Sequence, residues 1–140
     1  MPKSLVTTGA VIDGYTIGEC VHAGGMATLW TVTHPGIDVP LLMKIPRVSE
    51  GEDPAAIVSF EMEMMILPRL AGPHVPTCFG TGDFAHQAYV VIEQISGTTL
   101  YKRLPDLPLP YDEARLLVAR IATALADLHR QNVIHHDIKP

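Results

Sequence analysis

The first part of the chain consists of short apolar runs interrupted by glycine and proline, a pattern typical of β-strands. The first two runs flank a glycine-containing turn, His22–Met26, and predict a β-hairpin. A third run contains a single lysine, and two more follow a helical segment. The predicted strands cover residues 15–19, 29–33, 39–46, 77–82 and 87–94.

A helix is predicted between the third and fourth strands. Asp53 is a candidate N-cap and Pro54 suits the first helical position. Pro68 should end the helix, because proline disfavours the helical conformation of the residue before it. The apolar residues that recur at helical spacing are Ile57, Phe60, Met64 and Leu67.

After a proline-rich connector, Leu104–Pro110, the pattern changes to that of a long amphipathic helix. Asp112 is the candidate N-cap, and Asn132 is a stop signal because asparagine tolerates the left-handed conformation. Strands followed by a long helix, without regular β-α-β alternation, indicate an α+β fold. The apolar stripe consists of Leu117, Val118, Ile121, Leu125 and Leu128.

Composition narrows the class of protein. The chain has 140 residues, 47% of them hydrophobic, which suffices for one domain with a real core. Its formal charge of −5 argues against a general nucleic-acid binder. No apolar segment is long enough to span a bilayer, and residues 1–10 lack the apolar stretch of a secretory signal. Cys20 and Cys78 have no partner motif, so reduced thiols and a cytoplasmic location are expected.

Three features in the first part could carry chemistry. The Gly24-Gly25 tip would let backbone amides approach a polyphosphate, although a glycine pair can also be a plain tight turn. Lys44 in its apolar strand must either find a partner or reach water. Glu61 and Glu63 lie on opposite flanks of the helix's apolar stripe, so helix geometry does not choose between them as that partner.

The last six residues, 135–140, read His-His-Asp-Ile-Lys-Pro. A carboxylate near a hydroxyl, beside a cation, supplies the positioning and charge stabilisation that phosphoryl transfer needs. This segment closely resembles the protein-kinase catalytic loop, His-Arg-Asp-Leu-Lys-Pro. The upstream Ala23-Gly24-Gly25-Met26 segment resembles the nucleotide-covering loop of bacterial serine/threonine kinases. The resemblance extends from Tyr15 to Pro140.

The resemblance implies a protein-kinase-like α+β fold. It would comprise a five-stranded antiparallel N-lobe sheet with one helix, and the first helices of a truncated helical C-lobe. Residues 1–14 would be an N-terminal extension, 15–96 the nucleotide-binding N-lobe and 97–140 the start of the C-lobe.

The resemblance also implies ATP as cofactor and a protein serine or threonine as acceptor. Asp137 would accept the proton of the attacking hydroxyl and Lys139 would steady the transferred phosphate. Lys44 would hold the α- and β-phosphates, and the family spacing from Phe60 selects Glu63 as its partner. The implied nucleotide-binding positions are Val21, Gly24, Gly25, Leu29, Leu42, Lys44, Glu63, Glu93 and Ile95.

The chain departs from the family pattern at several positions. His22 and Ala27 replace the first and third glycines of the loop, Leu42 replaces a small adenine-facing alanine, and His136 replaces the arginine that pairs with a phosphorylated activation loop in many members. Histidine is a weak phosphate partner at neutral pH, so we hypothesise a kinase that does not depend on that switch. An alternative is a pseudokinase or nucleotide-sensing scaffold.

A third class, a metal-dependent hydrolase using His129, His135, His136 and Asp137, is disfavoured because adjacent histidines seldom converge on one ion. The kinase resemblance instead implies Mg²⁺, with ligands expected beyond residue 140 and none among the residues present. The 140-residue chain by itself is therefore expected to have little or no kinase activity.

Overall fold

The computed structural model describes residues 6–47 and 54–140. The chain divides into two compact units, which we call the sheet unit and the helical unit. The sheet unit comprises the residues up to Arg69 together with Pro76–Gln94. The helical unit comprises Leu70–Val75 and Ile95–Pro140. The short segment Leu70–Val75 thus belongs to the helical unit although sheet-unit residues flank it in sequence.

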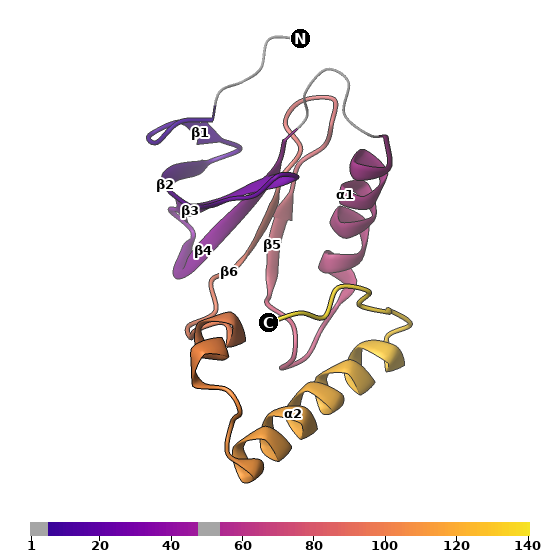
Figure 1. Ribbon diagram of the computed structural model, residues 1–140. Coiled ribbons are helices and arrows are strands. Elements are labelled where there is room, and N and C mark those ends of the chain that lie inside the picture. The colour runs from indigo at the N-terminus through magenta and orange to yellow at the C-terminus, as the bar shows by residue number, and fades with distance from the viewer. Residues whose placement is uncertain (1–5, 48–53) are drawn as a thin grey trace. The chain divides into compact units, whose positions relative to one another are not determined.

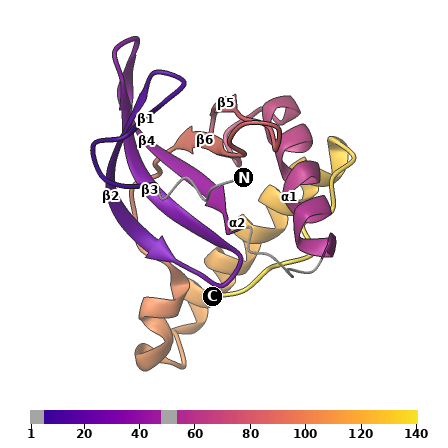
Figure 2. The same cartoon turned by 90° about the horizontal axis from the view of Figure 1, so that it is seen from above.

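The sheet unit contains a curled six-stranded antiparallel sheet with the order β1-β2-β3-β4-β6-β5 (Figures 1 and 2). All five predicted strands are present. The predicted count was too low by one, because β1 is only two residues long and leaves no recognisable pattern in the sequence. The strands are β1 (Val11–Ile12), β2 (Tyr15–Ala23), β3 (Ala27–His34), β4 (Ile37–Pro46), β5 (Cys78–Thr81) and β6 (Val90–Glu93).

The two faces of this sheet carry separate apolar clusters. Side chains alternate along β4, so Leu41, Met43 and Ile45 are buried on one face while Leu42 and Lys44 lie on the other. On the face that carries Met43, the three β4 side chains form one cluster with Tyr15, Ile17, Val32, Tyr89 and Val91. The second face packs against helix α1 through Phe60, Ala88 and Val90.

Helix α1 (Pro54–Ile66) begins at the predicted proline and lies beside the sheet in Figure 1. The predicted N-cap, Asp53, lies outside the described residues. The α-helix ends at Ile66, and the single 3-10 turn η1 (Leu67–Arg69) follows it and contains Pro68. Pro68 therefore stops the α-helical pattern as predicted, since the residue before it is no longer α-helical.

The helical unit contains the 3-10 helix η2 (Leu100–Asp106) and the α-helix α2 (Tyr111–Arg130). Helix η2 was not predicted and takes in part of the segment that the sequence indicated as a connector. Helix α2 has Pro110 rather than Asp112 as its N-cap residue. Asp112 lies instead in the first turn, where a carboxylate is favourable near the positive end of the helix dipole. Asn132 has φ +60°, which confirms the predicted left-handed stop.

The Leu70–Val75 segment is joined to the end of α2 by polar contacts. The Gln131 side chain accepts from the Ala71 N–H at 3.0 Å and donates to the Ala71 carbonyl at 2.9 Å. Asp127 contacts His74 Nδ1 at 3.1 Å and Arg130 at 3.0 Å. Because His74 and then Arg130 stabilise the carboxylate, the pKa of Asp127 is lowered.

The part of the chain that the structure describes contains no helix with the length and apolarity required to cross a membrane.

Candidate functional site

The most definite polar contact of the sheet unit joins β4 to α1. Lys44 Nζ lies 2.7 Å and 2.9 Å from the two carboxylate oxygens of Glu63. The alternation of β4 places Lys44 on the sheet face that α1 covers, opposite the Met43 cluster. Its Nζ also lies 5.7 Å from the centre of the buried Phe60 ring. The ammonium is thus held by two residues of one helix.

The structure distinguishes between the two helix glutamates that helix geometry left open. Glu63 is half-buried and bound to Lys44, whereas Glu61 is exposed. Glu63 and Phe60 are three residues apart, so both project from the same side of α1. The burial of Phe60 against the sheet therefore turns Glu63 toward β4.

Apolar side chains adjoin Lys44 on the same sheet face. In the register, Leu29 of β3 pairs with Lys44, and Leu42 pairs with Ile92 of β6. Directly paired residues place their side chains on one face, so Leu29 and Leu42 lie on the face that carries Lys44. Both are half-buried. This sheet face therefore carries an apolar strip, Leu29 and Leu42, beside the ammonium of Lys44.

The β2–β3 turn borders this face. The Gly24 N–H donates to the Ala27 carbonyl at 3.0 Å and closes the turn. A Cβ on Gly25 would have no atom within 4 Å, so the tip is open rather than packed. Before the turn the register shifts between Cys20 and His22, and Val21 is the extra residue of this bulge.

The segment that leaves the sheet is fixed by backbone bonds up to Gln94. The Glu93 N–H donates to the Thr77 carbonyl at 2.8 Å, and the Gln94 N–H donates to the Pro40 carbonyl at 2.9 Å. Ile95 begins the next part of the helical unit and is a 63% exposed residue. Glu93 and Ile95 are thus on either side of the boundary between the units.

The segment with Asp137 and Lys139 has local contacts of its own. Lys139 Nζ lies 3.1 Å from an Asp137 carboxylate oxygen, and each side chain is 70% exposed. The Asp137 N–H donates to His135 Nδ1 at 3.1 Å. Between them His136 has φ +63°, a left-handed conformation that few residues other than glycine adopt. The two candidate catalytic residues therefore lie side by side and are accessible in the irregular segment that follows α2.

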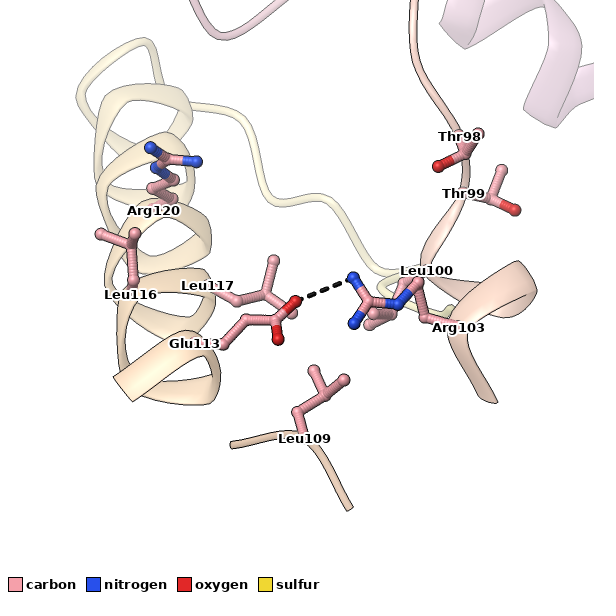
Figure 3. A pocket seen from close by; sticks show the side chains of 9 residues that line it. All are labelled: Thr98, Thr99, Leu100, Arg103, Leu109, Glu113, Leu116, Leu117 and Arg120. Atoms are coloured by element: carbon pink, nitrogen blue, oxygen red, sulfur yellow. Dashed lines mark hydrogen bonds and ion pairs between the residues drawn. The ribbon is translucent and has the colours of Figure 1, made fainter. Parts of the chain in front are cut away.

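The helical unit also contains a pocket of about 250 Å³ between η2 and α2 (Figure 3). Across this pocket, Arg103 of η2 forms an ion pair with Glu113 of α2 at 2.8 Å. The other residues that line the pocket are four leucines, two threonines and Arg120, which lies on α2. None of the predicted site residues lines it.

Sequence reasoning missed one contact of the Lys44 site. Phe60 was recognised as part of the apolar stripe and as the position from which the family spacing selects Glu63, but not as a contact of the ammonium, which its ring faces. Its spacing from Glu63 was the available signal. In the described ranges, 6–47 and 54–140, no group of three or more His, Cys, Asp or Glu side chains is arranged to hold a metal ion.

Comparison with known proteins defines the class. The family model described as protein kinase domain matches residues 15–140. The chain belongs to the protein kinase domain family.

Curated relatives are bacterial serine/threonine kinases. The chain is 30% identical over 130 residues to a Lactococcus lactis protein named probable serine/threonine-protein kinase PknB, covering 91% of this chain and 21% of the relative. It is 24% identical over 138 residues to serine/threonine-protein kinase PknI of Mycobacterium tuberculosis, covering 96% of this chain and 24% of that protein. The chain thus spans less than a quarter of the length of either relative.

The fold is that of a solved kinase domain. The crystal structure of the M. tuberculosis PknI kinase domain matches with a TM-score of 0.79 and 25% identity, covering 96% of this chain and 56% of that domain. The protein-kinase-like fold predicted from the sequence is confirmed.

Proposed function

We propose that the chain supplies the nucleotide-binding and catalytic-loop part of a serine/threonine protein kinase, which transfers the γ-phosphate of ATP to a protein hydroxyl. The observation that carries this proposal is the Lys44–Glu63 pair, in which both carboxylate oxygens lie within 2.9 Å of the ammonium. Membership of the kinase domain family supplies the context.

Lys44 is proposed to bind the α- and β-phosphates. A lysine side chain has many rotamers, and holding it against Glu63 and Phe60 reduces the entropy lost when it meets a phosphate. The open Gly25 tip would let backbone N–H groups approach the same phosphates without a Cβ in the way. Gly24 shapes the turn that carries this tip.

The adenine is proposed to lie on the apolar strip beside Lys44. Leu29 and Leu42 lie on that face, and Val21 precedes the turn at the bulge. The backbone groups of Glu93 and Ile95 would hydrogen-bond the adenine edge. We accordingly propose that residues 15–96 form the nucleotide lobe, with 1–14 as an extension and 97–140 beginning the other lobe.

In the transfer step, Asp137 would accept the proton from the acceptor hydroxyl as its oxygen attacks the γ-phosphorus. The new P–O bond forms as the bond to the β-phosphate oxygen breaks, and ADP leaves. Lys139, 3.1 Å from Asp137, would stabilise the charge of the transferred group. Mg²⁺, when bound, would neutralise phosphate charge, and we propose that residues beyond Pro140 complete its ligand set.

The proposal is tested by measuring Mg-ATP affinity of the Lys44→Met variant by titration calorimetry. We expect at least about a tenfold loss, because a charge-assisted phosphate contact is removed. Lys102→Met is the matched control, since Lys102 is exposed in η2 and has no proposed role. Equal affinities of the Lys44 variant and the unchanged chain would contradict the proposal.

A protein serine or threonine is the proposed acceptor, and a cytoplasmic location is proposed from the two free cysteines, Cys20 and Cys78. The acidic composition, with a formal charge of −5, favours a protein rather than a nucleic acid as the macromolecular partner.

A further inference from the structure

His22 is a chemically unusual residue for its position. It follows the Val21 bulge, directly before the glycine turn, where the kinase loop pattern has a glycine. Its Nε2 lies 3.3 Å from the point that a Cβ on Gly24 would occupy, so the imidazole folds over the turn. The side chain is exposed. An imidazole therefore lies over the part of the turn that has no side chains, Gly24-Gly25.

The cross-strand register places this imidazole on the Lys44 side of the sheet. His22 pairs with Leu29, and Leu29 pairs with Lys44. The three residues thus form a row across one face, with His22 and Lys44 separated by two strand spacings, roughly 10 Å. This separation is comparable to the length of a polyphosphate chain.

We propose that His22 is a phosphate-contacting residue that strengthens nucleotide binding when its imidazole is protonated. This inference rests on the nucleotide-binding function proposed above. A protonated imidazole donates N–H bonds from both nitrogens, and such bonds are stronger when the acceptor is an anionic phosphate oxygen. Imidazole is also the side chain that ordinarily titrates between about pH 5 and 8.

The charged surroundings of His22 are consistent with this role. On the same face, Lys44 of β4 and Glu63 of α1 neutralise each other. The intervening β3 positions, Ala27, Leu29 and Thr31, carry no charge. No described carboxylate forms an ion pair with His22. A charge gained by the imidazole would therefore be available to the nucleotide.

The test measures Mg-ATP, Mg-ADP and adenosine affinities of the full chain at about pH 6 and about pH 8. His22→Gln removes the imidazole, His22→Lys supplies a charge at both pH values, and His86→Gln is the control. His86 is an exposed histidine of the same unit that contacts Asp83 in another turn. Circular dichroism verifies that each variant is folded.

We compare how much the Mg-ATP affinity rises when the pH is lowered from about 8 to about 6. This rise should be about two- to fivefold larger in the unchanged chain and in His86→Gln than in His22→Gln, which is the range of an exposed ion pair. ADP should behave similarly and adenosine should show no difference. His22→Lys should exceed His22→Gln at both pH values.

A pH response equal in His22→Gln and the unchanged chain would overturn the inference while leaving the proposed nucleotide binding intact. The same would follow from a His22-dependent response with adenosine, because the contact would then be to the nucleoside. Absence of nucleotide binding by the unchanged chain at both pH values would overturn the inference together with the proposed function.

Discussion

At the scale of single residues, the Lys44–Glu63 pair combines short distances with partial exposure. The two Nζ–Oε distances are 2.7 Å and 2.9 Å, but the side chains are 34% and 33% exposed. Water screens such a pair, so its net contribution to the free energy of unfolding should not exceed about 1 kcal/mol. The geometry of the pair is therefore better explained by positioning of the lysine than by stability.

Replacing either helix glutamate tests that distinction. Glu63→Gln should lower Mg-ATP affinity several-fold while changing the free energy of unfolding by less than about 1 kcal/mol. Glu61→Gln, a change of the same chemistry on the exposed side of α1, should alter neither quantity. Urea denaturation and calorimetric titration measure the two effects. A loss of affinity in Glu61→Gln as large as in Glu63→Gln would contradict the assignment.

The residue pattern alone predicted the residue types of this site, and the family resemblance was needed to predict the Lys44–Glu63 contact. Lys44 was singled out because an isolated lysine in an apolar strand needs a partner. Helix periodicity left Glu61 and Glu63 equivalent, since it is insensitive to which flank faces the sheet. The family spacing from Phe60 selected Glu63, and the packing of Phe60 in one cluster with Val90 supplies the physical reason.

At the scale of elements, two glycines of the sheet unit have opposite surroundings. A Cβ on Gly82 would overlap the Gln87 carbonyl and approach the Tyr89 ring at 2.6 Å. Gly82→Ala should therefore destabilise the fold by about 1–3 kcal/mol, the usual cost of overpacking. A Cβ on Gly25 would meet nothing within 4 Å. Gly25→Ala should leave the free energy of unfolding nearly unchanged and weaken Mg-ATP binding.

Thermal or urea unfolding of the two variants, with nucleotide titration of Gly25→Ala, measures these effects. Comparable destabilisation by both substitutions would show that the Gly25 tip is packed. Undiminished nucleotide affinity of Gly25→Ala would show that its backbone does not need close approach to phosphate.

The junction between segment 70–75 and α2 should respond to acid. The pKa of Asp127 lies below its ordinary value of 3.8, chiefly because His74 and then Arg130 bind the carboxylate. A lowered folded-state pKa gives stability that is present above the unfolded pKa and lost as the pH falls through the folded pKa. The stability difference between the unchanged chain and Asp127→Asn should shrink as the pH falls below about 4. Urea titrations at several pH values measure it, and a difference independent of pH would contradict the contacts.

Element boundaries show where sequence reasoning failed. Helix η2 was missed because Leu104-Pro105-Asp106 reads as a connector, whereas a 3-10 turn accommodates the proline. Strand β1 was missed because its two residues are ordered by pairing with Tyr15 and Thr16 rather than by an apolar pattern. Long periodic segments such as α2 were predictable, because apolar residues recur at helical spacing over many turns.

At the scale of the whole molecule, the two units differ in how much side-chain surface they bury. The sheet unit contains two apolar clusters, and Met43 and Val91 at its centre are fully buried. Among the described hydrophobic residues of the helical unit, Leu128 alone is buried, with 8% of its surface exposed. Leu116, Val118, Ile134 and Ile138 of that unit are at least 50% exposed.

This contrast predicts uneven protection from amide hydrogen exchange. Opening free energies follow local burial, so amides of β4 and β6 should exchange at the rate of global unfolding. Amides of α2 should exchange at least about tenfold faster, because little apolar surface holds that helix in place. Mass spectrometry of peptides containing Met43, Val91 and Leu117 measures the three rates in one experiment. Equal protection of α2 and β4 would mean that the helical unit unfolds only together with the sheet, and its exposed leucines and valines would then require a covering contact in solution.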